Sequence, residues 1–190
     1  MAGAVTLTSN TMTLNGRQSG GTNLWFRDTM TLTHNSGTVD LTQTIGTTLF
    51  EHYDAQTVTL NNFTKTTAQT LTLYTSTDAK QLTFAGNVIL TAGIMDCVSG
   101  AQPAVNITVT GTSSVTGTLT LDSAAATFTG NATINSGGII QKNSSTGLVS
   151  IAGDVTNAGT FAHTGAGGTI TQTVAAKQIT TSTGTMQLNG

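Results

Sequence analysis

The chain has 190 residues, with six basic and eight acidic side chains, a net charge of −2 and a single cysteine. Charged residues make up 7% of it, against a usual share of about 25%, and the basic residues are scattered, so neither nucleic acid nor an anionic membrane is an expected partner. One cysteine excludes an internal disulfide. The sequence also contains no run of 18 apolar residues, the length that a membrane-spanning helix needs.

Threonine is the commonest residue, with 44 copies, and proline occurs once. Threonine favours strands through its branched β-carbon, and the 22 glycines supply turns. Such a composition also occurs in disordered chains, but apolar alternation persists almost end to end, at a mean hydropathy of +0.07. We therefore expect one all-β domain over residues 1–190, secreted with its leader removed or made without a signal.

The first 83 residues form the less regular part. Val5–Leu14 alternates apolar and polar residues, and Met30–Thr33 repeats this pattern about 25 residues after its first copy, so the repeat begins near the N-terminus. Asn23–Asp28 and Phe50–Asp54 differ, because they hold the only Trp and the only Glu. We expect these two segments to form an aromatic plug or contact surface, or else loops that leave the coil.

The clearest repeats lie between residues 84 and 190. Phe84–Val88, Phe128–Ala132 and Ile151–Val155 share one pattern, in which Gly lies between two apolar residues, and Ile107–Gly111 is a looser copy. Their starts are separated by about 21 to 23 residues, a period typical of solenoids. We predict a single parallel β-helix (β-solenoid) with about 21–24 residues per coil and roughly eight coils. A β-sandwich with similar strands is the alternative, but it seldom keeps both spacing and phase.

Equivalent residues of successive coils stack about 4.8 Å apart. The apolar positions of each copy then share one face, and the position of Asn87 gives a polar ladder, formed by Asn87, Thr110, Asn131 and Asp154. Asn and Thr can hydrogen-bond along such a stack, whereas like charges would repel one another, which accounts for the low charge content. Ile94–Pro103 interrupts the pattern and is expected to be a corner or surface loop, because proline cannot donate into a ladder.

The two ends of the chain resemble one another. Thr185–Gly190 almost copies Thr11–Gly16, and no amphipathic helix is predicted that could cap the coil. An uncapped coil leaves strand edges on which a second copy can continue the stack, and such head-to-tail contact generates an open filament. The residues predicted to form this contact are Val5, Leu7, Met12, Leu14, Trp25, Phe26, Ile179, Met186 and Leu188.

The sequence offers no cluster for catalysis, and we predict that the protein is not an enzyme and has no catalytic, cofactor or metal site. His34, His52 and His163 lie in unrelated contexts, without the spacing of a metal pair. A coil that cleaves polysaccharides would gather several acidic residues on one face. The candidates do not share one phase of the repeat; they are Asp78, Asp96, Asp122 and Asp154.

Thr-x-Thr pairs, such as Thr57/Thr59 and Thr108/Thr110, suggest an ice-binding face. Such a face needs one pair per turn at a fixed phase. The gaps between the pairs vary, and no pair occurs between Thr129 and Thr169, so the sequence favours threonine as an ordinary strand-surface residue.

Phe128–Gly138 and Ile151–Thr160 resemble the β-helix repeats of bacterial filamentous haemagglutinins and autotransporter passengers. The resemblance covers about half of the chain, from Phe84 to Leu188. It implies a right-handed parallel β-helix with an exposed structural or adhesive role. The chain is shorter than such proteins and shows no secretion or translocator segment.

The function expected from these features is that of a structural protein that self-assembles head to tail into an extracellular or cell-surface filament, with itself as partner and possible cell-surface or glycan contacts. One alternative is a phage or virus fibre or decoration subunit, located on the virion. Another is a carbohydrate- or ice-binding surface module.

Overall fold

The computed structural model describes residues 3–6, 9–14, 21–27, 30–42, 44, 48–53, 57–75, 78–97, 103–144, 146–165 and 169–188. Within these residues the chain forms 24 strands and no helix. Every pairing between strands is parallel and joins two strands that are three apart in chain order. The predicted all-β solenoid is therefore confirmed.

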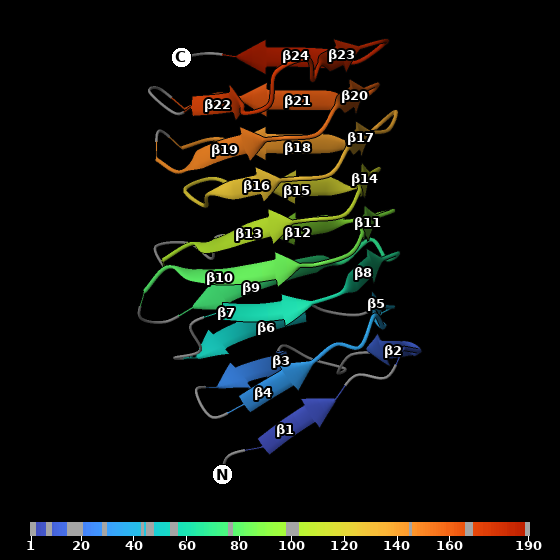
Figure 1. The fold of residues 1–190 in the computed structure, drawn as a ribbon, viewed down its shortest axis with the longest axis vertical. Helices are drawn as coiled ribbons and strands as arrows, with labels where there is room; N and C mark the ends of the chain where they lie inside the picture. The colour runs from blue at the N-terminus through green and yellow to red at the C-terminus, as the bar shows by residue number, and fades with distance from the viewer. Residues whose placement is uncertain are drawn as a thin grey trace.

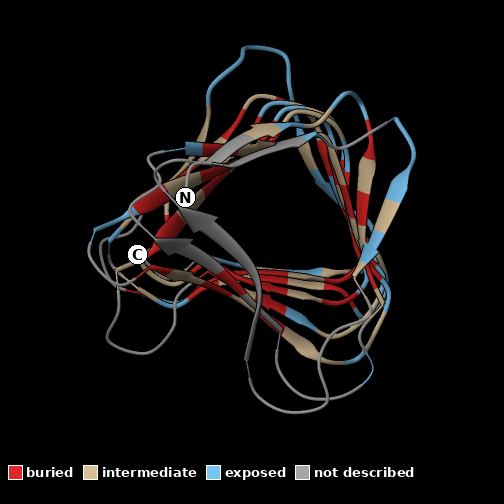
Figure 2. Ribbon diagram, turned by 90° about the horizontal axis from the view of Figure 1, so that it is seen from below, coloured by how far each residue is buried: buried red, intermediate tan, exposed pale blue. Residues whose placement is uncertain are grey.

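The strands occupy three sides of a triangular coil (Figure 2). The first side holds a two-stranded sheet, β1 (Gly3–Thr6) and β4 (Met30–Thr33), and a six-stranded sheet, β7 (Thr57–Leu60), β10 (Lys80–Phe84), β13 (Val105–Val109), β16 (Ala126–Phe128), β19 (Leu148–Ile151) and β22 (Thr169–Gln172).

The second side is an eight-stranded sheet, made of β2 (Thr11–Leu14), β5 (Thr38–Leu41), β8 (Asn62–Lys65), β11 (Val88–Leu90), β14 (Ser113–Val115), β17 (Ala132–Ile134), β20 (Val155–Asn157) and β23 (Ile179–Thr181). The third side is another eight-stranded sheet, made of β3 (Gly21–Arg27), β6 (Thr48–Tyr53), β9 (Thr70–Thr75), β12 (Ile94–Asp96), β15 (Thr118–Thr120), β18 (Ile139–Lys142), β21 (Thr160–His163) and β24 (Thr185–Leu188).

The coil is right-handed. In Figure 1 the chain climbs from the N-terminus at the bottom, crosses the front towards the right and returns at the back towards the left. The predicted number of coils is approximate: about six turns, from β7 onward, have all three sides continuous, and β1 and β4 form a separate sheet below them.

The core runs along the axis of the coil, because inward and outward residues alternate along each strand. In β9 and β10 the alternate positions Leu71, Leu73, Leu82 and Phe84 are buried. Phe63 lies between Phe50 and Phe84, with ring centroids 6.0 and 5.6 Å away. Each turn thus buries its apolar face against the turns above and below it, as a solenoid requires.

The repeated glycines form a corner of the coil. The sequence pattern suggests one strand from Phe84 to Val88; both residues do point inward, but Phe84 ends β10, Val88 begins β11, and Gly86 lies in the bend between them. A Cβ on Gly111 would come 2.5 Å from the carbonyl oxygen of Gly86, so neighbouring turns approach too closely here for any side chain.

The interruption predicted at Ile94–Pro103 is wrong for its first part. Ile94–Asp96 is strand β12, which pairs with β9 and β15 on either side, and Cys97 is buried in the core. Residues 98–102 lie outside the described part of the chain. Pro103 lies beyond this strand and does not disturb it, and Ile94 is an apolar residue on the outer face, where it is 39% exposed.

Candidate functional site: the polar ladder, the coil ends and the threonine face

The polar ladder runs along the corner between the first two sides. The side-chain oxygen of Asn62 accepts a hydrogen bond from the backbone N–H of Asn87 at 2.9 Å, and that of Asn87 accepts one from the N–H of Thr112 at 2.8 Å. Higher up, Asn131 accepts from the N–H of Asp154 at 3.0 Å. Each of these side chains therefore satisfies a backbone donor of the next turn at a bend, where regular strand pairing is interrupted.

Three of the four predicted ladder residues, Asn87, Asn131 and Asp154, lie in this column. Thr110 does not. Phe84 pairs with Val109, two residues after the start assumed from the sequence, and Thr112 is therefore the residue stacked on Asn87. Thr110 instead follows β13 on the outer face, where it is exposed. The copy at Ile107 was misaligned because Ile107 and Val109 both point inward, and pattern alone does not distinguish them.

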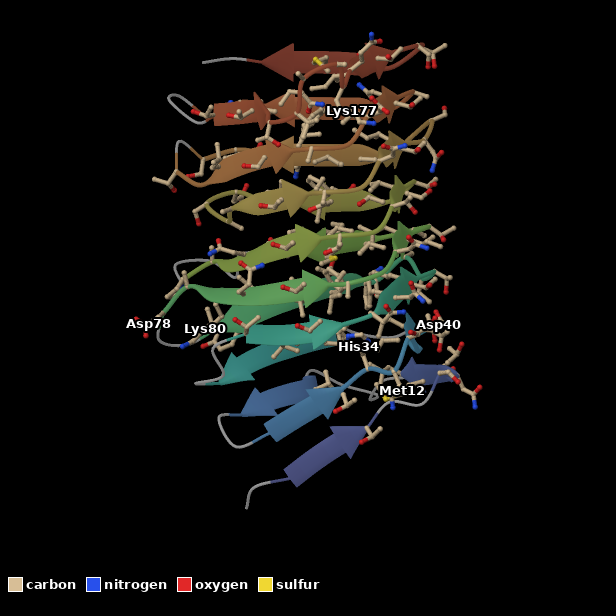
Figure 3. All side chains as sticks on the ribbon, viewed as in Figure 1. Met12, His34, Asp40, Asp78, Lys80 and Lys177 are labelled. Atoms are coloured by element: carbon tan, nitrogen blue, oxygen red, sulfur yellow. The ribbon has the colours of Figure 1, made fainter. Side chains whose placement is uncertain are left out.

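Asp154 accepts from the backbone N–H of Gln178 at 3.1 Å and forms an ion pair with Lys177, also at 3.1 Å. These contacts lower the pKa of its carboxyl, first through the Gln178 hydrogen bond and then through Lys177. The ladder therefore reaches the last turn of the described chain, where Lys177 is exposed (Figure 3).

Two buried lysines form hydrogen bonds at the other two corners of the coil. Lys65, at the end of β8, donates to the carbonyl oxygens of Thr67 at 2.5 Å and Ala92 at 3.0 Å, which belong to adjacent turns. Burial lowers its pKa to about 8. Lys142, at the end of β18, donates to the carbonyls of Asp122 and Thr146 in the same way, and burial lowers its pKa too. Both ammonium groups are used in internal hydrogen bonds across two turns.

The predicted contact residues lie on the first and last turns of the described coil. Met12 and Leu14 in β2, and Ile179 in β23 and Met186 in β24, are only partly buried although they pack against the core. Val5, Trp25, Phe26 and Leu188 belong to the terminal strands β1, β3 and β24, and their side chains lie outside the described part, as does all of Leu7. Figure 3 shows Met12 at the N-terminal end, far from Lys177.

The likeness of Thr185–Gly190 to Thr11–Gly16 does not reflect equivalent places in the coil. Thr185–Leu188 is on the third side, whereas Thr11–Leu14 is on the second. The strand of the first turn that corresponds to β24 is β3, and the one that corresponds to β23 is β2. Asn23–Arg27 and Phe50–Tyr53 are likewise not loops that leave the coil: they lie in the paired strands β3 and β6, and Phe50 is a core residue.

The outer face of the six-stranded sheet carries a threonine column that sequence spacing alone did not reveal. Strand register aligns Thr59 with Thr83, Thr83 with Thr108, Thr108 with Thr127, Thr127 with Ser150 and Ser150 with Thr171. Successive members lie 24, 25, 19, 23 and 21 residues apart, because loops of different length absorb the difference. The gaps between these residues vary in the sequence, but each residue occupies the same position in its turn of the coil.

The described residues contain no group of three or more His, Cys, Asp or Glu side chains placed to hold a metal ion. His34, in the bend before β5, accepts from the N–H of Ser36 at 3.4 Å, His52 lies in β6, and His163 is buried at the end of β21. Within the part of the chain that the structure covers, no helix is long and apolar enough to span a bilayer.

Comparison with known proteins gives no relative: no protein-family model, no curated protein sequence and no solved structure matches this chain.

Proposed function

We propose that the protein is a structural subunit that assembles head to tail, the last turn of one copy stacking on the first turn of the next, into a filament outside the cell. The observation that carries the proposal is that, within the described residues, both ends of the coil present outermost strands on the same three sides. At one end β22, β23 and β24 are the outermost strands of their sheets, and at the other end β1, β2 and β3 are.

The core columns would continue across the junction. Strand register places Met12, Val39, Phe63, Val88, Ser113, Ala132, Val155 and Ile179 in one inward column along the second side. Met12 and Ile179 are its two ends, and both remain partly exposed. A second copy stacked in phase would cover Ile179 with its own Met12, removing apolar surface from water at both ends.

The polar ladder would continue as well. The column of Asn87 ends with Gln178 just before β23 and begins with Thr11 in β2. In the stacked arrangement, the side chain of Gln178 takes the place that Asn131 has below Asp154. Backbone pairing, an apolar column and a polar column thus favour the same register, which limits slippage at the junction.

The experiment that tests this function is sedimentation velocity at rising protein concentration. Wild-type protein is expected to shift towards large, polydisperse species. Ile179→Lys and Met12→Lys each place an ammonium in the apolar column at the junction and are expected to keep the protein monomeric.

Thr180→Lys and Thr13→Lys are the matched controls, because they change exposed outward residues of the same two strands. They are expected to sediment like wild type. A wild-type protein that stays a monodisperse monomer at all concentrations would refute assembly, and discrete trimers would indicate a fibre subunit with closed symmetry instead.

A further inference from the structure

We propose that the outer face of the six-stranded sheet, called the threonine face below, binds the surface of ice. It consists of the column Thr59, Thr83, Thr108, Thr127, Ser150 and Thr171 and of the outward residues two positions before and after each member. The proposal concerns a side of the coil and does not depend on the stacking of its ends.

The central column is a regular array of hydroxyl and methyl groups. The six residues are hydrogen-bonded neighbours in a parallel sheet, so their side chains repeat about every 4.8 Å over about 24 Å. All six are partly exposed, and the hydroxyl of Thr108 also accepts a hydrogen bond from the side chain of Gln81 at 3.1 Å. A threonine side chain has few χ1 states, so the array is ordered before it meets any ligand.

The flanking columns are uncharged and mostly small, although they also hold Gln81 and the exposed Leu148. After the central column come Asn61, Ala85, Thr110, Thr129, Ala152 and Thr173; before it come Thr57, Gln81, Asn106, Ala125, Leu148 and Thr169. Thr110, Thr129 and Thr173 are exposed and complete Thr-x-Thr pairs on three turns. The outward column of the second side, in contrast, contains Asp40, and that of the third side contains Asp96.

The chemistry of this face fits ordered water better than a protein or a carbohydrate. Six strands and three columns cover on the order of 300 Å², well below the ~800 Å² per partner of a stable protein interface. The eighteen positions include no aromatic side chain on which a sugar ring could stack and no charge for an ionic ligand. Repeated hydroxyls can donate to and accept from a periodic water lattice, while the methyl groups lie against it.

Many weak and identical contacts add up only on a ligand that is itself periodic and extended. Ice presents such a surface, whereas liquid water does not. The regular spacing of the threonine face would then allow the protein to bind ice and not liquid water.

The test is ice recrystallisation inhibition by the full chain, with bovine serum albumin at equal mass as the blank. Wild-type protein is expected to keep ice grains small, and Thr108→Tyr, in the middle of the array, is expected to need at least about tenfold more protein, since disrupting a multivalent surface loses avidity of that order or more.

Thr156→Tyr is the matched control, because Thr156 is an exposed outward residue of β20 on a different side. It is expected to act like wild type, and circular dichroism of each variant before and after freezing verifies the fold. If Thr108→Tyr does not fold, Thr127→Lys replaces it.

Inactive wild-type protein would overturn the proposal, as would equal losses in Thr108→Tyr and Thr156→Tyr. Co-sedimentation with microcrystalline cellulose or chitin without effect on ice would also overturn it and assign the face to a polysaccharide surface.

Discussion

The side-chain oxygen of Asn87 accepts two hydrogen bonds from Thr112, one from the backbone N–H at 2.8 Å and one from Oγ1 at 3.0 Å. Asn87→Ala removes the acceptor for both and is expected to lower the free energy of unfolding by about 1 kcal/mol. Asn87→Asp keeps an acceptor and should lose less. Chemical denaturation monitored by circular dichroism measures the difference.

Thr110→Ala is the control for this prediction, because Thr110 is the exposed residue that the sequence alone would place in the ladder. It is expected to change the free energy of unfolding by no more than about 0.5 kcal/mol. If Thr110→Ala were as destabilising as Asn87→Ala, the register of β13 described above would be wrong.

The glycine corner makes a second prediction. A Cβ on Gly130 would overlap the carbonyl oxygen and carbon of Gly111 in the turn below, and backbone atoms cannot move aside as a side-chain tip can. Gly130→Ala is therefore expected to lower the free energy of unfolding by about 1–3 kcal/mol, in the range of overpacked sites. Thr129→Ala, at the exposed neighbouring position, should be close to neutral; a Gly130→Ala variant as stable as Thr129→Ala would show that the turns are not in such close contact.

Lys65 makes stability depend on pH. Burial lowers its pKa to about 8 in the folded protein, while the unfolded chain keeps a value near 10.4. Between about pH 8 and 10.4 the unfolded state binds more protons, so this group stabilises the fold progressively as pH rises and loses that contribution as pH falls through 8.

The measurement is the free energy of unfolding of wild type and Lys65→Met from pH 7.5 to 10.5. The difference between the two is expected to grow in favour of wild type by on the order of 2–3 kcal/mol. Thr64→Met, which changes a non-ionisable outward residue of the same strand β8, serves as the control and should follow the wild-type slope. Parallel curves for wild type and Lys65→Met would contradict the lowered pKa.

Cys97 should be unreactive in the folded protein. It is buried in the core, and burial, with smaller contributions from Asp96 and Asp122, raises the pKa of its thiol. Because the thiolate is the nucleophile, we expect a thiol reagent to label Cys97 only at the rate of unfolding, and completely in denaturant. Rapid labelling under native conditions would mean that this corner opens without global unfolding.

The architecture could be predicted from the sequence, because a solenoid repeats its residue pattern once in every turn. The sequence pattern correctly predicts the inward positions Phe84, Val88, Phe128 and Ile151 and three members of the ladder. Those residues sit at a tight corner, where few residue types fit and where the pattern is therefore strong.

Register was harder to predict wherever the constraint is only that a residue points inward or outward. Ile107 and Val109 are both inward, so the ladder was shifted by two residues at that turn. Loops of variable length hid the phase of Thr83, Thr108 and Thr127. The register of such positions is set by strand pairing between turns, and a single sequence does not show which residues pair.

The most direct test of head-to-tail assembly is electron microscopy of the purified chain at rising concentration, with power spectra of any elongated particle. Stacking in phase predicts long fibres with a layer line at about 4.8 Å and an axial repeat of ~40 Å, the rise of the eight strands stacked on the second and third sides. Single short rods at every concentration would contradict the account, because both ends of the coil would then remain uncovered.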